Sequence, residues 1–225
     1  MKIYGFPLSP FVRKDIVALK EKGLEAEVVP SNPSQPDEEF AAVSPFHKIP
    51  GFRDGDFTLA DSTAIVTYLE AKHPEPALLP ASPEARARAI WFEEVADTVF
   101  IPAGAPIVLN RFLRPHIFGV EGDEAAAVAA EEAVKRPLNY LEGAVTDGWL
   151  DSAFTVGDIA VASVIRTLAY AGWELDAAAY PRLTAWYGRV QAREGWKAAA
   201  EIEKSILSAA RGGYATFSGR PNKSR

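Results

Sequence analysis

The sequence predicts two differently built parts: an α/β domain of order β-α-β-α-β-β-α, followed by an all-helical domain. Most strand-like segments precede residue 61, whereas all five tryptophans lie after residue 90. A proline-rich stretch, 74–82, separates the two parts and is typical of a linker. We therefore expect a first domain over residues 1–76, a linker over 77–84, a helical domain over 85–211 and a mobile tail over 212–225.

The first domain opens with strand and helix signals in alternation. Lys2–Phe6 is a short strand candidate, and Glu25–Val29 is the next one. Between them, Pro10–Lys22 places its apolar residues on one broad side, as a helix does, and Gly23 is the expected stop.

A loop, a hairpin and a helix complete the first domain. Prolines and an asparagine make 30–36 a loop, and a short helix over Asp37–Val43 is expected to follow. The run Gly51–Ala60 carries Asp-Gly between two strand-like halves, which is the strongest short-range hairpin signal. Asp61–Lys72 then predicts a helix with Asp and Ser at its start.

The second domain begins with Ser82 as a helix cap, followed by proline at the first helical position. That helix is expected to run to about Phe100, and the segment Asn110–Gly122 interrupts the helical pattern. A long helix is predicted over Asp123–Val145, which Pro137 is expected to kink or divide.

The segment Thr155–Tyr170 is almost continuously apolar, so it predicts a buried, central helix. Thr155 and Asp158 have the spacing of a capping box, with Asp in place of the usual Glu or Gln. Two further helices are predicted over Pro181–Arg193 and Gly195–Ala210.

Composition excludes several classes of function. The net charge of −6 argues against a general nucleic-acid binder, and no apolar run is long enough to span a membrane. The chain has no cysteine, which removes disulfides, thiolate metal sites and a cysteine nucleophile. The three histidines are scattered, so no metal site is expected. No hydrophobic signal segment opens the chain, so a cytoplasmic location is expected.

Ser9 is the first candidate for chemistry. It stands before Pro10, a good first helical residue, so its side chain is placed at a helix N-terminus. The hydroxyl there has two interpretations: an ordinary helix cap, or a donor that activates a bound sulfur nucleophile. Position alone favours the cap.

Three motifs narrow that choice: LSPFVRK (residues 8–14), FHKIPGFRDGDFTLADS (46–62) and TVGDIAVAS (155–163). Together they resemble the cytosolic glutathione transferase family over most of the chain. The resemblance implies a thioredoxin-like first domain and an all-α second domain. It also implies glutathione as co-substrate without a metal, a small hydrophobic electrophile as second substrate, and a homodimer.

The resemblance assigns a role to Ser9 and leaves a rival. A free thiol has a pKa of about 8.5, and lowering it by two units takes roughly 2.7 kcal/mol. A hydroxyl and a helix N-terminus aimed at the sulfur are suited to this. Serine-type members use the serine of this motif, so Ser9 is preferred, with Tyr4 as the rival donor. Arg13 adds positive potential to the site or forms an exposed or interdomain salt bridge.

The same resemblance implies a glutathione site around two later motifs. A cis bond before Pro50 turns the backbone of Ile49 toward the cysteinyl part of the ligand, and Lys48 reaches the glycine carboxylate. Ser62 binds the γ-glutamyl carboxylate at a helix N-terminus, and Asp61 pairs with the ammonium. Many members have Glu or Gln where this chain has Asp61, and plain helix capping explains Asp-Ser equally well.

Three further expectations concern the second substrate and the partner subunit. Phe46 is expected to insert into the other subunit of a dimer, or else to pack within its own chain. The apolar pocket between the domains is assigned Val99, Phe100, Ile101 and Phe112 as walls. Tyr214 and Phe217 in the tail are candidates to close over it.

The leading function is therefore a glutathione transferase that conjugates the thiolate to an electrophile. A glutathione-dependent isomerase, dehalogenase or peroxidase shares the same activation step. The alternative of another class is a non-catalytic binding or assembly module on the same fold.

Overall fold

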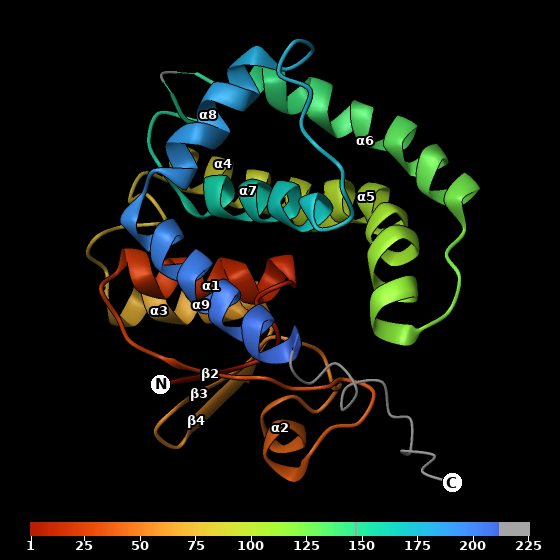
Figure 1. The fold of residues 1–225 in the computed structure, drawn as a ribbon. Helices are drawn as coiled ribbons and strands as arrows, with labels where there is room; N and C mark the ends of the chain where they lie inside the picture. The colour runs from red at the N-terminus through yellow and green to blue at the C-terminus, as the bar shows by residue number, and fades with distance from the viewer. Residues whose placement is uncertain (147, 212–225) are drawn as a thin grey trace, which may run out of the picture.

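The computed structural model describes residues 1–146 and 148–211, with side chains to residue 206. It consists of an α/β layer beside a larger helical layer (Figure 1). The predicted tail, with Tyr214 and Phe217, lies outside the described residues.

The first layer has the predicted element order. Its sheet contains β1 (Lys2–Tyr4), β2 (Glu27–Val29), β3 (Gly51–Asp54) and β4 (Phe57–Ala60), in the spatial order β2-β1-β3-β4. β1 pairs with β2 in parallel and with β3 antiparallel, and β3 pairs antiparallel with β4. The predicted hairpin is confirmed. The predicted first strand is shorter than expected, because Gly5 leaves strand geometry with a φ of 147°.

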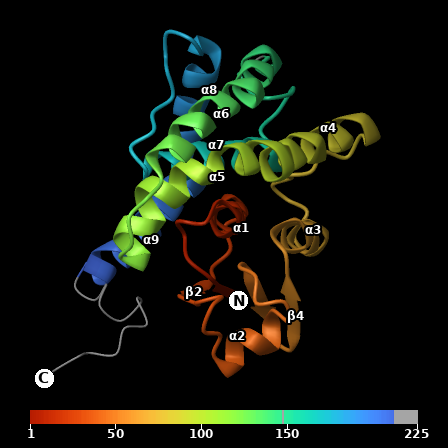
Figure 2. The ribbon, with the colours of Figure 1, turned by 90° about the vertical axis from the view of Figure 1, so that its right-hand side faces the viewer.

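Three helices cover this sheet: α1 (Pro10–Glu21), α2 (Glu38–Val43) and α3 (Ser62–Lys72). α1 and α3 lie on the face turned toward the helical layer, and α2 lies on the opposite face (Figure 2). Alternation along β1 explains the arrangement, since successive side chains point to opposite faces. Ile3 joins the main core on the α1 side, whereas Tyr4 packs with α2.

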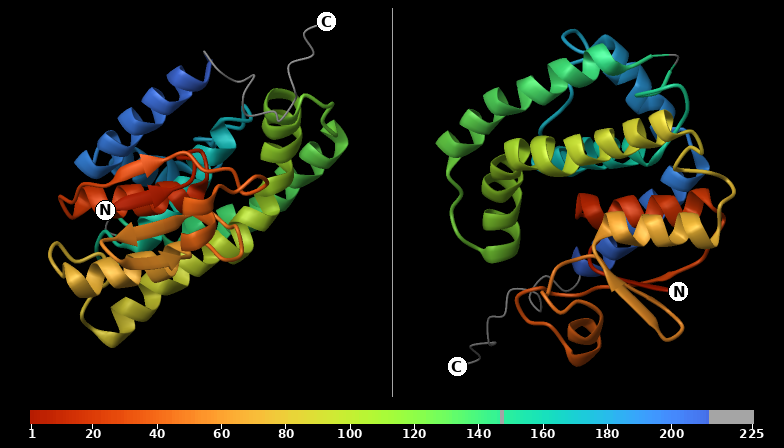
Figure 3. Two further views of the ribbon diagram at one scale, coloured as in Figure 1. Left: turned by 90° about the horizontal axis from the view of Figure 1, so that it is seen from below. Right: turned by 180° about the vertical axis from the view of Figure 1, so that it is seen from behind.

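The helical layer forms a bundle around one central helix. Its elements are α4 (Pro83–Glu94), η1 (Val95–Phe100), α5 (Ile101–Val108), η2 (Leu109–Phe118), α6 (Glu124–Ala144), α7 (Val156–Ala169), α8 (Pro181–Gln191) and α9 (Glu194–Arg211). α7 is buried along most of its length and contacts α1, α4, α5 and α8, as its apolar sequence predicts. α9 returns to lie along α1 (Figure 3). None of the helices described here is long and apolar enough for a bilayer crossing.

One sequence-based expectation for this layer is wrong, and a second is excluded in one of its two forms. The segment Asn110–Gly122 does not break the helix at its start: η2 continues to Phe118 as a π-helix, and Gly119 ends it in the left-handed conformation. Pro137 does not divide α6, which is continuous. Division of α6 is therefore excluded, and the alternative effect expected of Pro137, a kink, stays a prediction.

The N-terminus of α7 confirms the predicted capping box between Thr155 and Asp158. The Asp158 carboxylate accepts hydrogen bonds from the amides of Thr155 at 2.9 Å and Leu150 at 3.0 Å. It also accepts one from the indole of Trp186 at 2.7 Å. One buried carboxylate therefore joins α7, α8 and the preceding loop.

Asp15 on α1 is buried, and neither of its carboxyl oxygens has a hydrogen-bond partner among the described residues. Burial raises its pKa well above the ordinary value, with nearby Glu93 adding to the rise and Lys14 opposing it. The folded chain therefore holds a proton on Asp15 at pH values where the unfolded chain has lost it. Such a group makes stability fall as pH rises above about 3.9, the usual Asp pKa.

We expect Asp15→Asn to raise the free energy of unfolding at pH 7, because Asn keeps the shape without the charge. The gain should shrink as the pH approaches 4, where the carboxyl is protonated in both states. Urea denaturation at several pH values measures this, with Asp56→Asn on the exposed hairpin turn as control. If the variant is no more stable than the parent at pH 7, the claim that the buried Asp15 carboxyl destabilises the fold is wrong.

Candidate functional site

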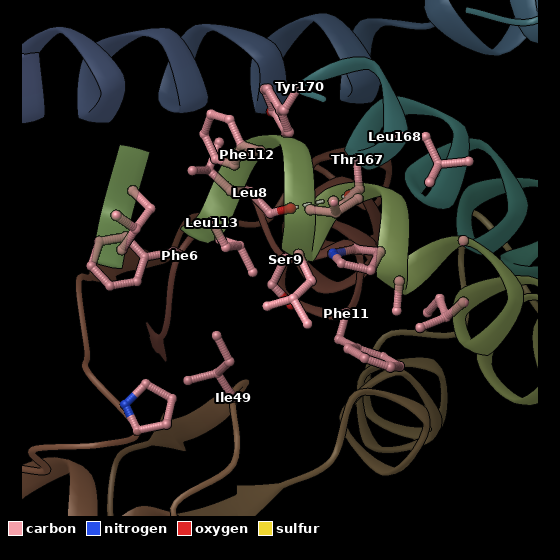
Figure 4. Close-up of a pocket in the computed structure, with 18 of the residues that line it drawn as sticks. Phe6, Leu8, Ser9, Phe11, Ile49, Phe112, Leu113, Thr167, Leu168 and Tyr170 are labelled. Atoms are coloured by element: carbon pink, nitrogen blue, oxygen red, sulfur yellow. Dashed lines mark hydrogen bonds between the residues drawn. The ribbon is translucent and has the colours of Figure 1, made fainter. Parts of the chain in front are cut away.

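A cavity of about 860 Å³ lies between the two layers (Figure 4). On one side it is lined by the loop from β1 to α1, the loop 32–35 and Ile49. On the other side it is lined by α5, η2, α7 and Ile206 of α9. Its walls are mostly aliphatic and aromatic, which is typical of a small-molecule site.

Ser9 lies on the wall of this cavity and is the N-cap residue of α1. Its backbone is fixed: the amide donates to Phe6 O at 2.9 Å, and the carbonyl accepts from Arg13 N at 3.0 Å. Its side chain, however, makes no capping hydrogen bond. In the described helices, each of the other Ser, Thr and Asp N-caps accepts one: Asp37, Asp61, Ser82, Asp123 and Thr155.

The Ser9 hydroxyl is therefore not used for the ordinary capping that its position predicts. It lies at the positive end of α1, where an anion is stabilised by the helix dipole and the first amides. A group bound in the cavity next to Ser9 meets both the hydroxyl and this helix end.

Tyr4, the rival donor, is fully buried beneath α2 and does not line the cavity. Its hydroxyl donates to Glu39 Oε1 at 2.6 Å. Burial and this bond to Glu39 raise the pKa of Tyr4. The alternation of β1 points Tyr4 away from the face that carries α1, which is why sequence proximity to Ser9 misleads.

Arg13 forms the interdomain salt bridge that was one of its two sequence-based interpretations. Its guanidinium is buried and pairs with Glu203 of α9, with the Tyr170 hydroxyl as a further partner. The pair joins the first layer to the last described helix.

The residues assigned to glutathione gather where β3 begins and β4 ends. The Ile49–Pro50 peptide bond is cis, as expected, and Ile49 lines the cavity. The register pairs Gly51 with Ala60, so Pro50 and Asp61 are neighbours, and the Asp61 amide donates to Pro50 O at 3.4 Å. Ser62 follows as a buried residue in the first turn of α3. Lys48 is exposed beside them.

Two backbone conformations mark this region. In the described part of the chain, the non-glycine residues with positive φ are His47, at 52°, and Asp61, at 84°. Such conformations cost about 1–3 kcal/mol and concentrate at ligand sites. The Asp61 side chain also caps α3 by accepting from Ala64 N at 3.1 Å. The Asp61 carboxylate has two acceptor oxygens, so it can cap α3 and also contact a positively charged group of a ligand.

The four residues assigned to the apolar pocket separate in the structure. Ile101 and Phe112 line the cavity. Phe100 is fully buried in the core instead, and Val99 is 43% exposed; neither lines the cavity. Both lie in the π-helical segment η1, whose wider turns change the direction of side chains relative to an α-helix.

Sequence reasoning missed several lining residues. They include Phe6, Leu8 and Phe11 around Ser9, Leu113 on η2, Thr167 on α7, and Tyr170, the C-cap residue of α7. The signal for Thr167 and Tyr170 was present, because they are polar groups at one end of an otherwise apolar helix. Phe6, Leu8 and Phe11 adjoin Ser9 in sequence, and their closeness to it was the available signal.

No charged side chain is among the described residues that line the cavity. Three arginines of the helices around the cavity are paired with carboxylates of the protein. Glu203 pairs with both Arg13 and Arg166, and Arg111 on η2 pairs with Glu124 and Glu131 at 2.5 Å each. The cavity therefore offers hydroxyls, amides and apolar surface to a ligand.

Phe46 is 85% exposed, the largest exposure among the large apolar side chains described. Packing within its own chain, one of its two sequence-based interpretations, is therefore wrong. The exposed ring is accessible to another molecule.

Comparison with known proteins covers both layers. Residues 3–77 match the family model of the glutathione S-transferase N-terminal domain, and residues 83–189 match that of the C-terminal domain. A curated glutathione S-transferase from Hyoscyamus muticus is 30% identical over 212 residues, which are 91% of this chain and 99% of that protein.

Solved structures agree with the fold. A glutathione S-transferase from Rhodospirillum rubrum F11 is 29% identical, with a TM-score of 0.81 over 88% of this chain and 90% of its own. A maleyl pyruvate isomerase, described as a bacterial zeta-class glutathione S-transferase, has a TM-score of 0.74 over 90% of this chain and 98% of its own. It is 22% identical, so this likeness shows the fold alone.

Proposed function

The chain belongs to the glutathione S-transferase family, and on that premise we propose that it transfers the glutathione thiolate to an uncharged, apolar electrophile. The thiol releases its proton to solvent, the Ser9 hydroxyl donates a hydrogen bond to the resulting thiolate sulfur, and the N-terminus of α1 adds its positive potential. The observation that carries the proposal is the Ser9 hydroxyl, which lines the cavity and makes no capping bond.

Glutathione would lie along the ends of β3 and β4. The Ile49 backbone pairs with its cysteinyl part as an added strand would, next to the cis bond to Pro50. The γ-glutamyl carboxylate binds Ser62 at the start of α3, and Asp61 pairs with the ammonium. Lys48 takes the glycine carboxylate.

The reaction needs a nucleophile and proximity. Only the thiolate attacks well, so the protein first stabilises it, and then holds the electrophile against it. The sulfur forms a bond to an electrophilic carbon, and the leaving group departs with its electron pair. The apolar walls, including Ile101 and Phe112, hold the body of the electrophile.

The uncharged wall distinguishes this proposal from isomerisation of a carboxylate-bearing substrate. Taking an ionised carboxylate into an apolar site without a cation costs several kcal/mol. Arg13, Arg111 and Arg166 are held by carboxylates of the protein itself. A dehalogenase or peroxidase with an uncharged substrate uses the same site and remains a second candidate, as does a binding module that retains glutathione without turnover.

We also propose a homodimer in which Phe46 inserts into the other subunit. Its ring is 85% exposed on the loop between α2 and β3. Phe46→Ser should shift the protein from dimer to monomer in analytical ultracentrifugation. A variant that remains dimeric assigns Phe46 another role.

A pair of matched electrophiles tests the function. We expect turnover of glutathione with chlorodinitrobenzene, and a kcat/KM lower by about a hundredfold for a chloronitrobenzoate, after each is divided by its uncatalysed rate. Equal or faster enzymatic reaction of the carboxylate contradicts the uncharged-substrate proposal. If calorimetry detects no binding of glutathione at millimolar concentration, the proposal that the protein is a glutathione-dependent enzyme is wrong.

A further inference from the structure

Thr167 is a residue of the second layer that reaches the peptide before Ser9. It lies on α7, half-buried in the cavity wall (Figure 4). Its Oγ1 lies 3.0 Å from Leu8 O in the loop from β1 to α1. It also lies 2.9 Å from Ser163 O, one turn earlier in its own helix.

A threonine hydroxyl has one proton, so it donates fully to one of these two carbonyls. Ser163 O is inside α7, where it accepts the regular bond from the amide four residues later. Leu8 O precedes the helix, and in the described residues Thr167 is the partner that the structure gives it. Donation to Leu8 gives both carbonyls a partner, whereas donation to Ser163 leaves Leu8 O without one among the described residues, so donation to Leu8 is favoured.

Arg13 completes the arrangement from the other side. Its Nη1 lies 3.5 Å from Thr167 Oγ1, at the limit of a hydrogen bond, and can donate to the lone pairs that remain on that oxygen. The guanidinium itself is held by the buried carboxylate of Glu203. A chain of polar contacts therefore runs from α9 through Arg13 and Thr167 to the Leu8 carbonyl.

We propose that Thr167 is a positioning residue that fixes the direction of the Ser9 hydroxyl; this rests on the proposed function of Ser9. Leu8 C=O and Ser9 N belong to one rigid peptide plane. The bond from Thr167 holds one side of that plane, and the bond from Ser9 N to Phe6 O holds the other. Without Thr167, the plane rotates more freely and the Ser9 side chain turns with it.

Thr167→Val keeps the shape of the side chain and removes its hydroxyl. We expect it to raise the pKa of the bound glutathione thiol by about one unit, from about 6.5 to about 7.5, which makes the thiolate fraction at pH 7 about threefold smaller. kcat should fall in proportion, whereas the KM for glutathione should change little, because Thr167 does not belong to the proposed glutathione site. Thr167→Ser should restore both the thiol pKa and kcat.

Thr184→Val is the matched control, because its buried hydroxyl lies on α8 and has no hydrogen-bond partner among the described residues. It should leave the thiol pKa unchanged. A thermal melt of each variant checks folding, and Thr167→Ala serves if the valine variant does not fold.

The outcomes separate this inference from the proposed function. If Thr167→Val leaves the thiol pKa at the parent value while Ser9→Ala raises it, the positioning role is overturned and the role of Ser9 stands. If Ser9→Ala leaves it unchanged as well, the proposed role of Ser9 fails and the inference fails with it. A rise in Thr167→Val that Thr167→Ser does not reverse also overturns the inference.

Discussion

Replacing Asp158 with alanine is expected to destabilise the fold by about 4 kcal/mol, because it leaves three buried N–H groups without an acceptor. These are the amides of Leu150 and Thr155 and the indole of Trp186. An unpaired buried donor costs about 1–3 kcal/mol. Against a typical stability of about 5–15 kcal/mol, the variant should unfold at a much lower urea concentration.

Asp123→Ala is the matched control, since Asp123 also caps a helix but lies near the surface, where it accepts from Ala126 N at 3.0 Å. Losing this cap should cost about 1 kcal/mol. Asp158→Asn, which keeps one acceptor oxygen, should fall between the two. Equal losses for Asp158→Ala and Asp123→Ala contradict a central role of Asp158 in joining the helices.

Replacing Ser9 with alanine is expected to lower kcat/KM at pH 7 by about 25-fold, if the hydroxyl supplies most of a two-unit lowering of the thiol pKa, from about 8.5 to about 6.5. The loss depends on pH in a defined direction. Above about pH 9 the thiol ionises without help, so the parent and the variant should converge. This pH dependence is measured as kcat/KM between pH 5.5 and 9.5. The apparent pKa of each protein is then compared with the pKa of a free thiol, which is about 8.5.

Two variants distinguish the hydroxyl of Ser9 from its neighbours. Ser34→Ala removes another hydroxyl of the cavity wall, in the loop 32–35 and not at the N-terminus of α1, and should keep the parent profile. Tyr4→Phe should also keep it, because the Tyr4 hydroxyl is bonded to Glu39 beneath α2. If Tyr4→Phe changes the pH dependence of kcat/KM and Ser9→Ala does not, then Tyr4, and not Ser9, is the donor to the thiolate.

Local signals account for what the sequence predicted well. Asp-Gly produced the hairpin between β3 and β4, and the spacing of Thr155 and Asp158 produced the capping box. The uninterrupted apolar run of α7 indicated its central position. Each of these features depends on residues a few positions apart, so the chain alone contains them.

Long-range packing accounts for what the sequence did not predict. Whether the Ser9 hydroxyl caps α1 depends on how the loop from β1 to α1 is held. Thr167, which is 159 residues from Leu8 in the sequence, contacts that loop. The cavity wall depends on the π-helical segments, which buried Phe100 and exposed Val99. Neither segment has a sequence signature comparable to a cap or a turn.

The central claim is that Ser9 stabilises the thiolate of bound glutathione. Its most direct test is the ultraviolet absorbance of the thiolate as a function of pH, at saturating glutathione, for the parent and Ser9→Ala. The parent should show a thiol pKa about two units below the value of about 8.5 for a free thiol, and the variant should return close to that value. A variant that binds glutathione with the pKa of the parent would contradict the claim.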